Sequence, residues 1–96
     1  MLYFVEIDVK IPDAIDPSRL AELQAREKIA SAEYQLAGEW LHLWRIAGKF
    51  GSVSVFNVPD HDRLHEVLSS LPLFPFMTVR VLPLARHPGA LASSPG

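Results

Sequence analysis

Apolar and polar residues alternate along residues 2–10. This period of two predicts a β-strand with one buried face, because successive side chains of a strand point to opposite sides. The two faces are Tyr3, Val5, Ile7 and Val9 on one side, and Leu2, Phe4, Glu6, Asp8 and Lys10 on the other. Pro12 and Pro17 follow, and proline ends a strand because it has no backbone N–H to donate.

A helix is predicted from Pro17 to Ala37. Asp16 is a suitable N-cap before a proline at the first helical position, and Gly38 suits the left-handed residue that ends many helices. Apolar residues with helical spacing form two stripes, which are Ala25, Ile29, Ala32 and Leu36, and Leu20, Leu23, Ala30, Tyr34 and Ala37. Two stripes predict burial on two sides, against the helix's own sheet and against a second surface.

The rest of the chain predicts a hairpin, a second helix and a final strand. Residues 40–47 and 52–58 have strand character and are joined by a turn at residues 48–51. Asp60 is a suitable cap for the second helix, and residues 77–84 alternate again after an apolar connector that contains prolines. The second helix has one apolar stripe, formed by Leu64, Val67, Leu68 and Leu71.

The order of these elements, β-α-β-β-α-β, predicts an α+β fold of the ferredoxin-like type. The two helices would cover one face of the sheet, and a chain of 96 residues has nothing left for the other face. A second copy of the chain is the simplest cover. We expect one domain over residues 1–88 and a flexible C-terminal tail over residues 89–96, where Pro, Gly, Ala and Ser dominate.

The composition excludes several classes of protein. The chain is 49% hydrophobic, which favours a packed domain over a disordered segment. Its formal net charge is -2 and it has no basic block, so we expect no nucleic-acid partner. It has no cysteine, which excludes disulfides and thiolate sites. No stretch resembles a membrane span or a signal peptide, so we expect a cytoplasmic protein without a membrane partner.

Glu27 is the most informative polar residue because its helical position falls within the stripe that contains Leu23 and Ala30. A carboxylate there costs free energy unless it is paired or its pKa rises. A pKa raised towards neutrality suits a general base. The alternative is a carboxylate at the stripe edge that reaches solvent or pairs with Lys28 or a neighbouring subunit. Lys28 itself lies off both stripes, although its long stem can reach the edge of a site.

Aromatic and basic residues concentrate on the strand at residues 40–47. The alternation places His42 between Trp40 and Trp44 on one face and Arg45 on the other. Aromatic walls with a few polar groups are typical of small-molecule pockets and also of subunit interfaces, so both interpretations stay open. Arginine is well suited to bind a substrate carboxylate through two hydrogen bonds. Further candidates on strand faces are Phe4, Glu6 and Arg80.

We expect no metal site and no phosphate-binding loop. The four histidines lack the spacing of a metal motif. The Gly-x-x-Gly segment at residues 48–51 is a hairpin turn rather than a phosphate loop, because no helix follows it.

A series of short segments occurs together and in order along the chain. The most specific are Arg26-Glu-Lys28, Gly38-x-Trp40-x-His-x-Trp-Arg-Ile46, Leu71-Pro-Leu-Phe-Pro-x-Met77 and Arg86-His-Pro88. Each segment alone is a weak signal, but the whole series is specific and spans residues 1–88. In these segments the sequence closely resembles the muconolactone Δ-isomerase family.

The resemblance implies a dimeric α+β barrel, assembled further into a homodecamer, that works without a cofactor. It also implies an isomerase that converts muconolactone, a small lactone, to 3-oxoadipate enol-lactone in the breakdown of catechol. Two alternatives remain open. One is a chloromuconolactone dehalogenase or methylmuconolactone isomerase on the same scaffold, and the other is a non-catalytic oligomer that binds a small ligand.

The implied reaction is an allylic proton shift, which assigns roles to the candidate residues. Glu27 is expected to be the base, since its stripe position and the Arg-Glu-Lys segment agree. Lys28 or His42 would donate a hydrogen bond to the developing oxyanion. Arg45 or Arg80 would hold the substrate carboxylate. The remaining expected substrate-binding residues are Phe4, Tyr34 and Trp44.

Overall fold

The computed structural model describes residues 1–91. The elements follow the order β1 (Leu2–Val9), α1 (Pro17–Leu36), β2 (Trp40–Arg45), β3 (Gly51–Asn57), α2 (His61–Ser70), η1 (Phe74–Phe76) and β4 (Met77–Leu84). The predicted β-α-β-β-α-β order is confirmed, and the short 3₁₀ turn η1 is an addition. The expected flexible tail falls largely on residues 92–96, which lie outside the described residues.

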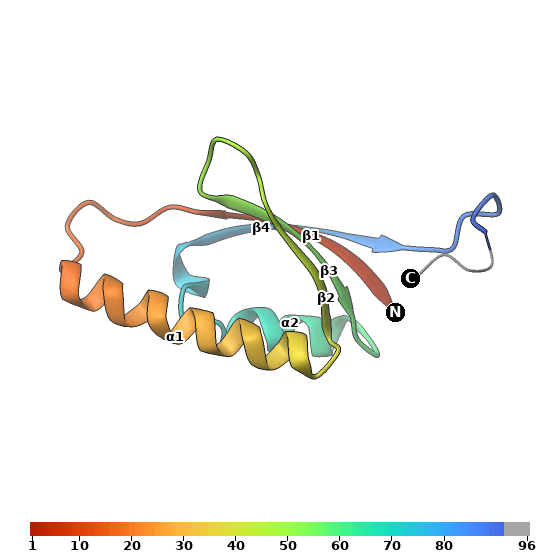
Figure 1. Ribbon diagram of the computed structural model, residues 1–96, viewed down its shortest axis with the longest axis horizontal. Coiled ribbons are helices and arrows are strands. Elements are labelled where there is room, and N and C mark those ends of the chain that lie inside the picture. The colour runs from red at the N-terminus through yellow and green to blue at the C-terminus, as the bar shows by residue number, and fades with distance from the viewer. Residues whose placement is uncertain (92–96) are drawn as a thin grey trace.

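The four strands form one antiparallel sheet in the order β2-β3-β1-β4. Both helices lie on the same side of this sheet, and no other element of residues 1–91 covers the opposite side (Figure 1). The predicted inward face of β1 is confirmed, because its tyrosine, valine and isoleucine are buried against the stripe of α2. The core consists mainly of Tyr3, Val5, Ile7, Trp40, Phe56, Val58, Leu64, Val67, Leu68 and Leu71.

Helix α1 begins where the sequence predicts and ends within one residue of the predicted end. The Asp16 side chain accepts a hydrogen bond of 3.0 Å from the backbone N–H of Ser18. Gly38 follows the C-cap with φ of 80°, a conformation that favours glycine because side chains clash there. Leu23 is the one residue of α1 that is fully buried. No helix among residues 1–91 is long and apolar enough to cross a membrane.

Strand β2 departs from the alternation that its sequence predicts. Trp40 pairs with Phe56 and His42 pairs with Val55, so one extra residue lies in β2 between the two pairs. This β-bulge places Trp40 in the core, 4.7 Å from Phe56 between ring centroids. The expectation that Trp40 shares a face with His42 and Trp44 is therefore wrong, because the extra residue reverses the direction of the side chains that follow.

Candidate active site

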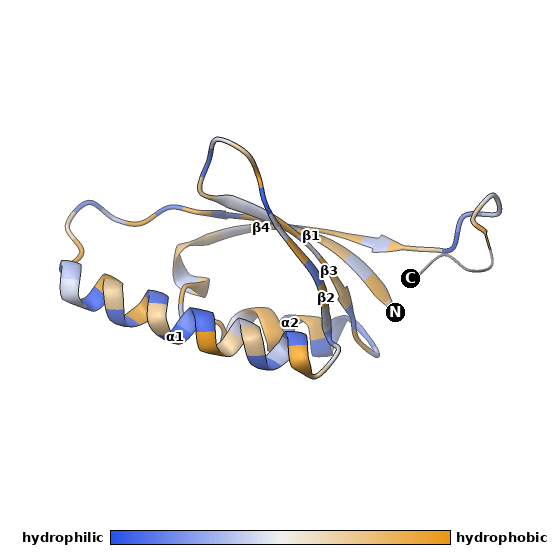
Figure 2. Cartoon of the chain, in the orientation of Figure 1, coloured by the Kyte–Doolittle hydropathy of each residue, from blue (hydrophilic) through white to orange (hydrophobic). Residues whose placement is uncertain are grey.

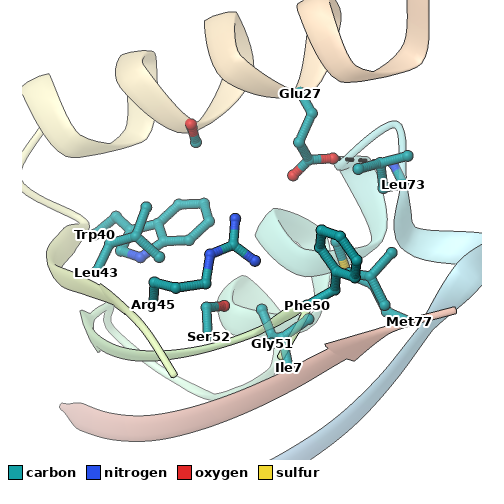
Figure 3. Close-up of a pocket in the computed structure, with 12 residues that line it drawn as sticks. Ile7, Glu27, Trp40, Leu43, Arg45, Phe50, Gly51, Ser52, Leu73 and Met77 are labelled. Carbon is teal, nitrogen blue, oxygen red and sulfur yellow. Dashed lines mark hydrogen bonds between the residues drawn. The ribbon is translucent and has the colours of Figure 1, made fainter. Parts of the chain in front are cut away.

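A cavity of about 280 Å³ lies between α1 and the helix-covered side of the sheet. Glu27 points into it from α1 above, and Arg45 points into it from β2 below (Figure 3). The remaining walls are mostly apolar. The lining residues are Ile7, Val9, Glu27, Ser31, Trp40, Leu43, Arg45, Phe50, Gly51, Ser52, Leu73 and Met77.

Glu27 is half-buried and is held by one hydrogen bond. Its carboxylate oxygen Oε1 accepts the backbone N–H of Leu73 at 2.9 Å, which connects α1 to the segment after α2. Burial raises the pKa of the Glu27 carboxyl above its ordinary value, and the hydrogen bond from Leu73 opposes this shift more weakly. The direction of this shift agrees with the interpretation of Glu27 as a general base, and the carboxylate retains an oxygen that faces the cavity (Figure 3).

Arg45 reaches the cavity because β2 resumes regular alternation after its bulge. It pairs with Ser52 on β3, and Ser52 pairs with Ile7 on β1, so the three side chains share the face of the sheet that α1 covers. Among residues 1–91, Arg45 makes no ion pair with a carboxylate. Its guanidinium is thus available to an anion in the cavity.

A second and larger cavity of about 610 Å³ adjoins the first. The two share four lining residues, which are Val9, Arg45, Phe50 and Leu73. The larger cavity is also lined by the polar residues Lys10, Asp13 and Gln24. Arg45 therefore lies at the boundary between the mostly apolar cavity that contains Glu27 and the larger, more polar cavity next to it.

Two other predicted site residues on α1 lie outside these cavities. Lys28 is exposed and follows Glu27 by one residue, which turns its side chain away from the sheet. Tyr34 packs against the core, and its hydroxyl lies 2.6 Å from the Ser70 hydroxyl at the end of α2. These positions do not test the expected roles, so Lys28 as a hydrogen-bond donor and Tyr34 as a substrate-binding residue stay predictions.

The four remaining predicted residues, Phe4, His42, Trp44 and Arg80, lie on the uncovered face of the sheet. The register places Phe4 beside Val55, and Val55 beside His42, on the side opposite Tyr3 and Phe56. The His42 and Trp44 rings stack there with centroids 4.9 Å apart. Arg80 contacts the carboxylate of Glu6 at 3.3 Å. These residues therefore form a separate group that the single chain does not bring together with Glu27.

Several cavity residues were not singled out from the sequence. Ser52 pairs with Arg45 across the hairpin, so the turn at residues 48–51, taken together with Arg45, could have pointed to it. Leu73 contributes its backbone N–H, and no side-chain pattern predicts such a contact. Phe50, at the tip of the hairpin, gave no periodic signal because it lies in the turn.

The arrangement suits proton transfer within a small anionic compound. A carboxylate of raised pKa can take up and return a proton, an arginine can hold an acidic group, and the mostly apolar walls offer few competing hydrogen-bond partners. Among residues 1–91, no group of three His, Asp or Glu side chains lies together as metal ligands would.

Comparison with known proteins identifies the family. The model of the family described as muconolactone delta-isomerase matches residues 1–90. Muconolactone Delta-isomerase 2 of Acinetobacter lwoffii is 47% identical over 91 residues, covering 95% of each chain. Muconolactone Delta-isomerase of Rhodococcus opacus is 44% identical and covers 90% of this chain and 92% of the relative.

A crystal structure of muconolactone isomerase superposes with a TM-score of 0.92 at 45% identity, and 98% of each chain is covered. The likeness therefore includes the three-dimensional arrangement of the strands and helices as well as the sequence. The resemblance predicted from short segments is confirmed, and the chain belongs to the muconolactone delta-isomerase family.

Proposed function

We propose that this chain isomerises muconolactone, with Glu27 as the base. The observation that carries the proposal is a half-buried carboxylate that shares an apolar cavity with an arginine that has no ion-pair partner among residues 1–91. Relatives that are 42–47% identical over most of the chain bear the name of this activity. The cavity of about 280 Å³ is of the size expected for a small ligand.

The proposed reaction moves one proton and one double bond. Glu27 removes the proton from the ring carbon that bears the acetate arm, and the electron pair shifts through the ring onto the lactone carbonyl oxygen. The resulting dienolate takes a proton at the carbon next to the carbonyl, which leaves the double bond at its new position. Because both carbons belong to one small ring, a single carboxylate on one ring face can perform both transfers.

Arg45 is proposed to bind the carboxylate of the acetate arm. It faces Glu27 across the cavity and also lines the larger, more polar cavity next to it (Figure 3). This position would direct the arm outwards and the reacting ring inwards. Holding the ring in one orientation is itself a large part of catalysis, because it removes the entropy cost of finding the reactive geometry.

The developing oxyanion needs a hydrogen-bond donor. The cavity offers the hydroxyl of Ser52 in addition to Arg45, whereas the Ser31 hydroxyl already donates to the backbone oxygen of Lys28 at 3.1 Å. The donors predicted from the sequence, Lys28 and His42, lie outside the cavity in the single chain. A donor role for either of them would require a residue movement or a second subunit, whereas Ser52 already lines the cavity beside Arg45.

We further propose that the uncovered face of the sheet pairs with the same face of a second copy, giving the expected dimeric barrel. Trp44 is 54% exposed on this face, together with exposed leucines of β4. The Glu6–Arg80 ion pair lies among them. An apolar face with an aromatic centre and a few charges is the composition expected of a subunit interface.

The activity is tested by proton NMR of muconolactone with catalytic amounts of the chain in D2O buffer. Loss of the two olefinic signals of the substrate and appearance of the enol-lactone would establish the isomerisation. Incorporation of deuterium next to the carbonyl would report proton exchange at the base. Unchanged substrate, with a folded and assembled protein, would contradict the proposal and favour a substituted lactone or a binding role.

A further inference from the structure

Helix α1 is weakly anchored for its length. It spans 20 residues, yet Leu23 is its one fully buried residue. Its side away from the sheet exposes Ile29 by 61% and Leu36 by 90%. Apolar stretches recur along α1 in Figure 2. The sequence predicts a second buried side for this helix, and residues 1–91 leave Ile29 and Leu36 exposed there.

The exposed apolar residues of α1 form one continuous stripe, which we call the outer stripe. Its spacing of three and four residues keeps all members on one side of the helix. Two large side chains alternate with small ones, which would let another helix approach closely. The members of the outer stripe are Ala21, Ala25, Ile29, Ala32 and Leu36, all of them at least partly exposed.

Opposite charges border the outer stripe on one edge. Arg26 and Glu33 are both exposed and lie seven residues apart, which is about two helical turns, so they share this edge. Arg26 lies 3.9 Å from Glu22, while Glu33 has no ion-pair partner among residues 1–91. The midpoint between Arg26 and Glu33 falls next to Ile29, the large apolar residue at the centre of the stripe.

We propose that the outer stripe is an interface between two copies of this chain, with the two α1 helices packed antiparallel about a two-fold axis at Ile29. In an antiparallel pair of helices, residues on the same edge face each other with reversed numbering. The axis at Ile29 therefore brings Arg26 of each copy to Glu33 of the other, so that two ion pairs form. The same arrangement places Leu36 of one copy over the small residues Ala21 and Ala25 of the other.

The surface next to the stripe supports this geometry. A hollow of about 250 Å³ lies beside Ile29 and is bordered by Arg26 and Glu33. Its far wall is formed by Ser70 and Pro72, at the end of α2. A side chain from a second helix can fill this hollow while its charged neighbours meet Arg26 and Glu33. The charge pattern selects a second copy because the same sequence supplies both the arginine and the glutamate.

The proposed interface differs from the sheet face in position and has two consequences. Two distinct two-fold contacts in one chain generate assemblies with an even number of subunits. The contact would also stabilise the packed position of α1 on the sheet, because a second helix would cover its exposed side. Because Glu27 lies on the inner side of α1, the assembly would hold the proposed base in place. The interface itself does not rest on the proposed activity.

The test is charge reversal with rescue, measured as assembly mass by light scattering and sedimentation at several concentrations. Arg26→Glu sets a carboxylate against Glu33 twice in each contact, so the dissociation constant of the assembly should rise about tenfold or more. Glu33→Arg should have a similar effect. The double variant R26E/E33R restores both pairs and should recover the wild-type mass. Rescue cannot arise within one helix, because residues seven apart are not neighbours on it.

Arg86→Glu is the matched control, since it makes the same charge change at an exposed residue beyond β4. It should leave the assembly mass unchanged, and Ile29→Asp should lower the mass without a charge partner being involved. Circular dichroism checks that each variant is folded. A wild-type chain that stays monomeric, an unchanged mass for R26E, or failure of the double variant to recover would each overturn the proposal.

Discussion

The carboxylate of Glu27 accepts a hydrogen bond from the backbone N–H of Leu73 at 2.9 Å, although the two residues are 46 positions apart in the chain. This contact fixes one oxygen of the carboxylate and leaves the other towards the cavity. It also joins α1 to the segment between α2 and β4. The carboxylate of the proposed base is thus oriented by a backbone group, so its orientation does not depend on the rotamer of another side chain.

Glu27→Gln should abolish most turnover while the fold stays intact. The glutamine oxygen can still accept the Leu73 N–H, but an amide cannot take up the ring proton. We expect kcat to fall by about 10²–10⁴-fold, the usual contribution of a general base. Glu66→Gln, an exposed position on α2, is the control and should keep wild-type kcat. Full turnover by folded Glu27→Gln would show that another group is the base.

The pH dependence of kcat/KM should report the raised pKa of Glu27. The base must be ionised, so activity should fall as the pH drops through this pKa. The inflection should lie above the ordinary range of a glutamate, because burial disfavours the charged form. A profile that stays flat down to the ordinary glutamate range would contradict the assignment.

Stability should change with pH in a related way. The folded state of Glu27 binds its proton more tightly than the unfolded state, because its pKa is raised, so the cost of burying the charge is fully present above the folded pKa. This cost is lost as the pH falls to the unfolded pKa. Urea unfolding should therefore find Glu27→Gln more stable relative to wild type at neutral pH than at low pH. The opposite trend would mean that the folded protein stabilises the carboxylate.

Arg45→Met should weaken substrate binding more than it slows chemistry. Loss of a hydrogen-bonded charge partner costs about 1.5–3 kcal/mol, which corresponds to a rise in KM of about 10–150-fold. Arg19→Met is the matched control, since it removes a cation from the exposed side of α1, away from both cavities. If Arg19→Met raised KM and Arg45→Met did not, the carboxylate site would lie outside the cavity described above.

Trp44→Asp should weaken the proposed pairing of the sheet faces. The indole is 54% exposed in the single chain, and a charge at the centre of an apolar interface is costly to bury. Light scattering should show a smaller assembly than for wild type. Ala47→Asp introduces the same charge in the hairpin turn and should leave the mass unchanged. Equal masses for wild type and Trp44→Asp would place the interface elsewhere.

Ser54→Ala should stabilise the fold. Ser54 is completely buried, and its hydroxyl has no hydrogen-bond partner among the described residues. An unpaired buried hydroxyl costs about 1–3 kcal/mol, so its removal should raise the free energy of unfolding by about 1 kcal/mol. Urea denaturation measures the change, with exposed Ser69→Ala as a control that should have little effect. A destabilised Ser54→Ala would indicate that the hydroxyl has a partner in solution.

The elements of the fold could be predicted because each carries a local signal. Alternation defined β1 and β4, and the caps at Asp16 and Asp60 set the helix starts. The bulge in β2 could not be predicted in this way. Its sequence contains no proline or glycine that would mark an irregularity, and the extra residue becomes visible only when Trp40 and His42 are paired with successive residues of β3.

The candidate site was predictable in part. Glu27 stood out because a carboxylate within an apolar stripe is unusual, and the stripe is a property of the helix alone. The sequence also placed Arg45 on the face opposite His42, and the register confirms this. It did not indicate which of these two faces meets Glu27, because that depends on the side of the sheet on which α1 packs.

The sequence by itself determined the order of strands and helices, the caps and the position of Glu27 within an apolar stripe of α1, because these follow from neighbours within one element. The family was determined as well, by short segments in a fixed order. The tertiary structure decided that Glu27 and Arg45 share a cavity while His42 and Trp44 lie on the other side of the sheet. Such relations depend on strand register, the bulge and the docking of α1, which are set by long-range packing and leave no local periodic signal.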